Sequence, residues 1–152
     1  MIKGCYDFEF YKQIRSYFTD FGFEDNTIWN HVLFFNLLSD CIGGPDQRYM
    51  RGTPEQEKRA NERFLSVLQM ERPHKVLVFT KRGWSTLPPC REEAGGQDLR
   101  PLNLENFPDF YYGTYDVSGH IVTAFGLRHP QGAPRQLMRE AVKYILKRKL
   151  PD

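Results

Sequence analysis

Apolar residues recur three or four positions apart in three segments of the chain, a spacing that predicts amphipathic helices. These segments are residues 7–19, 53–71 and 134–149. The middle segment has the clearest start, because Thr53 can serve as an N-cap, Pro54 suits the first helical position and Gln56 completes a capping box. This helix is expected to end near Glu71, ahead of Pro73.

Three shorter apolar runs lack helical spacing and predict buried strands. They are residues 31–35, 76–80 and 121–125. Their apolar residues do not alternate with polar ones, which is typical of strands covered on both faces. Because a helix, a short loop and a buried strand follow one another, we expect right-handed crossovers between parallel strands. The pattern predicts an α/β fold with three α/β/α layers around a short, mainly parallel central sheet.

The chain of 152 residues is expected to form a single domain, residues 1–152. Residues 87–112 contain several prolines, the pair Gly95-Gly96 and scattered acids, without a long periodic segment. They are expected to form an irregular excursion on the surface, of the kind that is often functional.

Composition excludes several classes of protein. A formal net charge of +2 with dispersed basic residues does not by itself demand nucleic acid. Cys5, Cys41 and Cys90 are far apart and form no C-x-x-C pair, which argues against a disulfide framework, a zinc site or a four-cysteine cluster. No stretch has the length of a membrane span, and no signal peptide opens the chain. We expect a cytoplasmic protein with no metal, no cofactor and no membrane contact.

Polar side chains follow each of the three predicted strands. They are Asn36, Lys81 with Arg82, and Arg128 with His129. If the strands are parallel neighbours, these groups meet at one edge of the sheet, where open α/β sheets collect ligands. The imidazole of His129 could donate a hydrogen bond to a developing oxyanion or titrate near neutral pH. The alternative is structural, since polar residues routinely end strands and His129 could simply cap its loop.

Three segments in this order resemble the uracil-DNA glycosylase superfamily. They read WNHVLFFN at residues 29–36, KVLVFTKRGW at 75–84 and HPQ at 129–131. The resemblance implies a domain that recognises a flipped base in uracil-containing or otherwise damaged DNA, with hydrolysis of the N-glycosidic bond as its activity. It implies that an Asn reads the Watson–Crick edge of uracil and that a His stabilises negative charge on the uracil oxygen.

Carried over residue by residue, the resemblance implies that Asn36 and His129 are catalytic. Asn36, with Phe35 beside it, would bind the base. The DNA-facing residues would be Arg128, Pro130, Gln131 and Gly132 of the loop, with Lys81 and Arg82 near the phosphates.

The sequence departs from the family at two places. The family's first motif, on an N-terminal strand, positions or activates water, and Gly4 to Asp7 is at most a remnant of it. Gln131 stands where the family's loop has a serine. A missing strand would leave a sheet edge that a second subunit, in a homo-oligomer, could cover. Two alternatives stay open: a catalytically inactive nucleic-acid or protein-binding module on the same fold, and an enzyme that binds a phosphorylated ligand at Gly43-Gly44.

Overall fold

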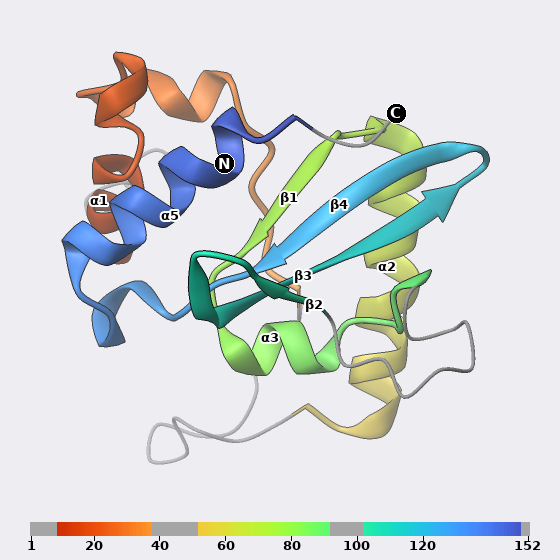
Figure 1. Cartoon of the computed structure of the whole chain (residues 1–152). Helices are drawn as coiled ribbons and strands as arrows, with labels where there is room; N and C mark the ends of the chain where they lie inside the picture. The colour runs from red at the N-terminus through yellow and green to blue at the C-terminus, as the bar shows by residue number, and fades with distance from the viewer. Residues whose placement is uncertain (1–8, 38–51, 92–101, 150–152) are drawn as a thin grey trace.

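The computed structural model describes residues 9–37, 52–91 and 102–149, in which helices and a mixed sheet form a small α/β fold (Figure 1). The α-helices are α1 (Glu9–Ser16), α2 (Pro54–Glu71), α3 (Lys81–Thr86) and α5 (Arg135–Lys147). The strands are β1 (Lys75–Val78), β2 (Leu102–Leu104), β3 (Phe107–Val117) and β4 (His120–Gly126). Short 3-10 helices are η2 (Thr19–Phe21), η3 (Asn26–Asn30) and η4 (Pro130–Gly132).

Helix α2 begins and ends where its sequence predicts. The Thr53 side chain accepts a hydrogen bond from the Gln56 N–H at 3.2 Å, and the Gln56 side chain accepts one from the Thr53 N–H at 2.9 Å. The predicted capping box is therefore confirmed. Residues 76–80 and 121–125 are confirmed as the sites of strands β1 and β4, and residues 134–149 contain α5.

The four strands lie in the order β1-β4-β3-β2. Only β1 and β4 are parallel, whereas β4 pairs with β3 and β3 with β2 in antiparallel fashion. The expectation of a mainly parallel sheet is therefore wrong. The cause is a two-residue hairpin between β3 and β4, in which Ser118 and Gly119 have φ of 54° and 78° and the Asp116 carboxylate accepts the Gly119 N–H at 2.8 Å. Turns with two positive φ angles match the strand twist of hairpins.

Two further expectations are wrong. The predicted strand at residues 31–35 pairs with no strand in the described part of the chain, and the segment continues from η3 without regular structure. The described part of the predicted excursion at 87–112 contains β2 and the first half of β3, while residues 92–101 lie outside the described residues. Burial alternates in the second half of β3, at Gly113, Tyr115 and Val117, whereas Phe110 in the first half is buried in the other core.

Helices cover both faces of the sheet, as the three-layer prediction requires. One core joins α1 and α5 to the sheet, with Ile14, Phe125 and Met138 among its buried members. The other joins α2 to the opposite face, with Phe64 of α2 packed against Tyr115 of β3 at a ring distance of 5.3 Å. Figure 1 shows α1 and α5 on one side of the strands and α2 on the other.

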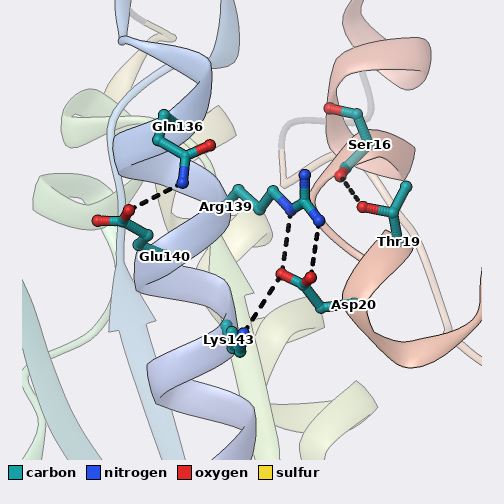
Figure 2. A network of polar contacts seen from close by, with 7 residues as sticks. All are labelled: Ser16, Thr19, Asp20, Gln136, Arg139, Glu140 and Lys143. Atoms are coloured by element: carbon teal, nitrogen blue, oxygen red, sulfur yellow. Dashed lines mark hydrogen bonds and ion pairs between the residues drawn. The ribbon is translucent and has the colours of Figure 1, made fainter.

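Two polar contacts attach α5 to the rest of the domain. The ammonium group of Lys75, at the start of β1, donates hydrogen bonds to the last carbonyls of α5, those of Ile145, Leu146 and Arg148 at 2.8, 2.9 and 2.8 Å. A cation at this end of a helix satisfies free carbonyls and opposes the helix dipole. Further along α5, Arg139 forms a bidentate pair with Asp20, at 3.0 and 2.7 Å, with Lys143 3.9 Å away (Figure 2).

We expect Lys75→Met to lower the free energy of unfolding by about 2 kcal/mol, the scale of hydrogen bonds made by a charged group. Methionine keeps the apolar stem of lysine but removes the ammonium donor from the carbonyls of Leu146 and Arg148 and leaves that of Ile145 with the Arg148 N–H alone. Urea unfolding followed by circular dichroism measures the loss. Lys12→Met is the matched control, because Lys12 is an exposed residue of α1. Equal losses in the two variants would contradict the capping role.

We expect the Asp20 carboxylate to stabilise the fold above its ordinary pKa and to stop doing so in acid. The hydrogen bonds from Arg139 hold the pKa of Asp20 below its ordinary value of 3.8. A carboxyl group with a lowered folded-state pKa contributes stability that is lost as the pH falls through that pKa. Asp20→Asn should therefore have a lower urea midpoint than the native chain at pH 7, and the gap should close below pH 3.8. Asp109→Asn, at an exposed position of β3, should show no such gap.

Candidate functional site

The carboxyl ends of β1 and β4 lie side by side. Val78 pairs with Gly126, and the Leu127 N–H donates to the Val78 carbonyl at 2.8 Å. Each strand then runs into a capped turn. Thr80 caps α3 by accepting the N–H groups of Arg82 and Gly83, at 3.1 and 3.4 Å. The parallel pair therefore brings the segments that follow its two strands to one edge of the sheet.

A cavity of about 490 Å³ is lined by β1 and by residues from both ends of that strand, including Thr80, Gly83 and His129 at the carboxyl end. Its walls come from α1, from residues 31–37, from α2, and from β1 with the residues up to Gly83. Asn36 and His129 both line it, so the two residues expected to share a crevice do share one. Most of the lining is apolar, as is usual for pockets that bind small organic groups. The aromatic members include Phe10, Phe34, Phe35 and Phe79.

The His129 side chain is held in one tautomer. The residue is exposed, caps η4, and its Nδ1 accepts the Gln131 N–H at 3.2 Å. A backbone N–H can only donate, so Nδ1 carries the lone pair and the proton of the neutral imidazole is on Nε2. The ring also packs against Phe10, with centroids 5.4 Å apart. The result is an N–H donor on a residue that lines the cavity.

Asn36 reaches the same cavity by a route that differs from the predicted one. It follows residues without regular structure and not a strand. Its carbonyl accepts a hydrogen bond from Arg63 of α2 at 3.3 Å, and the same guanidinium lies 5.4 Å from the Phe35 ring. The exposed side chain of Asn36 is thereby placed by a contact of its own backbone with α2.

The basic residues of the site have different surroundings. Lys81 and Arg82 are exposed in the first turn of α3, at the carboxyl end of β1 as expected. Arg128 is half-buried and donates to the Gly132 carbonyl at 3.0 Å, which closes the loop that carries His129. Pro130, which the resemblance assigns to the DNA-facing loop, is buried. Gln131 and Gly132 are exposed.

Of the aromatic residues that line the cavity, the family resemblance indicated Phe35 but not Phe10, Phe34 or Phe79. Phe34 is part of a cluster in which its ring lies 5.3 Å from Tyr11, 6.0 Å from Trp29 and 6.4 Å from Phe10. The sequence did contain a signal for this cluster, because aromatic residues recur in the first predicted helix and again at Phe34 and Phe35. That signal is weak, because aromatic residues in both places are equally typical of a core.

Within the described ranges, no three His, Cys, Asp or Glu side chains gather into a group that could hold a metal ion. None of the helices searched in those ranges has both the length and the apolar character needed to cross a membrane. Gly43-Gly44, the alternative phosphate site, lies outside the described residues.

Comparison of the chain with protein-family models, with curated proteins and with solved structures returns no match.

We expect Gly126→Ala to destabilise the junction between β4 and α3. A Cβ at Gly126 would lie 2.6 to 2.8 Å from ring atoms of Trp84, and such contacts force the indole and α3 to shift. Overpacking of this kind costs roughly 1–3 kcal/mol, which urea unfolding can measure. Gly132→Ala is the matched control, since a Cβ there meets nothing within 4 Å. A loss as small as that of the control would show that Trp84 adapts without cost.

Proposed function

We propose that this chain is a uracil-DNA-glycosylase-like domain that binds a base flipped out of DNA and hydrolyses its N-glycosidic bond. The observation that carries the proposal is that Asn36 and His129 line one cavity, with His129 just beyond the carboxyl end of β4. Both residues come from the segments whose sequence resembles the family. The expected cytoplasmic location belongs to the same proposal.

The tautomer of His129 suits the reaction. Cleavage of the bond between uracil and deoxyribose leaves negative charge on the base, and a preoriented N–H near O2 stabilises that charge as it develops. Nδ1 is occupied by the Gln131 N–H, so Nε2–H is the donor available to the base. A neutral imidazole acts here as a hydrogen-bond donor and gives up no proton.

The base would be recognised by Asn36. The Asn36 amide can accept from N3–H and donate to O4 of uracil at once, a combination that cytosine does not match. Phe34 and Phe35 line the same cavity and offer ring faces for the flipped base. Lys81, Arg82 and the exposed Gln131-Gly132 turn would then face the DNA backbone around the lesion.

One observation favours a second candidate, a module that binds DNA without cutting it. Among the described residues, the cavity lining holds a single carboxylate, that of Glu71. Glu71 ends α2, just ahead of β1, whereas His129 follows the carboxyl end of the neighbouring strand β4. It therefore lies at the wrong end to activate water beside the base. On this alternative the cavity holds the base and the glycosidic bond stays intact.

We expect Asn36→Ala and His129→Ala each to reduce uracil release from a labelled oligonucleotide by at least 100-fold, about 2.7 kcal/mol of transition-state stabilisation. Neither change should lower the thermal midpoint much, because both side chains are exposed. Release of base is measured by alkaline cleavage and gel electrophoresis under single-turnover conditions, with hypoxanthine and mismatch substrates alongside uracil.

Asn30→Ala and His74→Ala are the matched controls, since both residues are exposed and neither lines the cavity. Retained excision in Asn36→Ala or His129→Ala would remove that residue from the mechanism. If the native chain releases no base yet binds the oligonucleotide in a salt-sensitive manner, the non-cutting candidate replaces the proposal.

A further inference from the structure

Four basic residues follow one another along the surface of α5. Each stands four positions after the last: Arg135, Arg139, Lys143 and Lys147. Residues four apart on a helix are neighbours on its surface, and their positions are about 6 Å apart along the axis. The side chains of the first three are 65%, 39% and 44% accessible, and Lys147 is exposed. We call these four residues the basic row.

The carboxylates beside the basic row do not neutralise it. Glu9 lies 3.9 Å from the first guanidinium of the row. Asp20 pairs with Arg139 at 2.7 Å and lies 3.9 Å from Lys143. Lys147 forms no ion pair with any residue that the structure describes. In the described part of the chain, two carboxylates are therefore shared among four cations.

The pair with Asp20 leaves donors of the row available. Only Nε and one terminal nitrogen of Arg139 bond to the carboxylate, whereas a guanidinium carries five N–H groups. Lys143 is within ion-pair distance of Asp20, and no hydrogen bond joins the two among the described contacts. Glu140 bonds to Gln136 at 2.8 Å, on the other side of α5 from Asp20 (Figure 2). The basic row therefore has both net positive charge and N–H groups for an anion.

The basic row begins next to the candidate site and leads away from it. Arg135 is three residues beyond Gly132, where the loop that carries His129 ends. The other end of α5 lies where the parallel strands begin, because Lys75 at the start of β1 bonds to the last carbonyls of α5. The row therefore runs alongside the sheet from the carboxyl end of the parallel pair to its amino end, over about 18 Å.

We propose that the basic row binds the phosphates of a single DNA strand that leaves the candidate site and runs along α5. The inference rests on the proposed function, because it takes the site at His129 as the place from which the strand leaves. Cations about 6 Å apart along a helix match the spacing of successive phosphates in an extended strand. Each phosphate that Lys or Arg neutralises releases counterions, which favours binding at low salt.

The course of the row decides against two other polyanions. Duplex DNA is stiff over about 50 nm. A duplex laid across the carboxyl ends of β1 and β4 would therefore reach only the first cation, and one laid along the row would leave the site. An anionic membrane binds a helix whose apolar face enters the lipid. The apolar residues Met138, Val142 and Ile145 of α5 are instead buried in the core.

The first test uses the full chain and a fluorescein-labelled single strand of about 12 thymidines, which contains no uracil. Fluorescence anisotropy gives the slope of log K against log salt. The double variant Lys143→Gln with Lys147→Gln should reduce the magnitude of this slope by about 1.4, because each of two lost phosphate contacts contributes about 0.7. The matched control, Lys58→Gln with Arg59→Gln, changes exposed residues of α2 on the other face of the sheet and should leave the slope unchanged. Equal slopes in the two double variants would overturn the proposal.

A second test removes the carboxylate that competes with the strand. Asp20→Asn frees Arg139 and Lys143 and should tighten binding of the same oligonucleotide at least threefold. Asp109→Asn is the control, since it removes the same charge from an exposed position of β3. Folding of both variants is checked by circular dichroism at the pH of the assay. An equal effect of the two changes would assign the pair with Asp20 to structure alone and contradict the proposal.

The remaining outcomes separate this inference from the proposed function. If the native chain releases uracil from a single strand and the Lys143→Gln, Lys147→Gln variant binds and releases it equally well, the inference fails and the proposed function stands. If no base is released but the salt slopes differ as expected, the proposed function fails and the row remains a surface for single strands. Tighter binding of a blunt duplex than of the single strand would overturn the inference. Loss of binding to phosphatidylserine vesicles, without loss of binding to DNA, would assign the row to a membrane.

Discussion

The parallel pairing of β1 with β4 is the contact on which the arrangement of this domain depends. It is fixed by bonds such as Leu127 N–H to the Val78 carbonyl, between segments far apart in the sequence. At the carboxyl end of the pair, the turn that starts α3 and the turn that carries His129 come together. At the amino end, Lys75 holds the last carbonyls of α5. Without this pairing, neither the site nor the position of the C-terminal helix would be defined.

The parts of the fold that the sequence predicted are those with local causes. The capping box of α2 needs only Thr53, Pro54 and Gln56, all within one turn, and the structure reproduces it. Strands β1 and β4 are continuous apolar runs because helices cover them on both faces. The position of His129 also followed from a local signal, since a polar turn after a buried strand is placed by the strand itself.

The parts that were missed depend on partners far away in the sequence. Residues 31–35 have the composition of a strand, but a strand exists only where a neighbour pairs with it, and no described strand pairs with this segment. Strand β3 contains Pro108 and Gly113, which weaken any local strand signal, and it is stabilised by pairing with β4 on one side and β2 on the other. The Ser118-Gly119 turn was a readable signal for this hairpin.

The candidate base site has one wall that the sheet does not hold. The position of residues 31–37 depends on Phe34, on Phe35 and on the bond from Arg63 to the Asn36 carbonyl, and no described ladder holds their backbone. His129, by contrast, directly follows the segment that leaves β4, in a loop that the bond from Arg128 to the Gly132 carbonyl closes. A ligand that contacts both Asn36 and His129 would therefore join a wall held by the sheet to a wall held by side-chain contacts. Part of its binding free energy would then go into holding residues 31–37 in one position relative to β4.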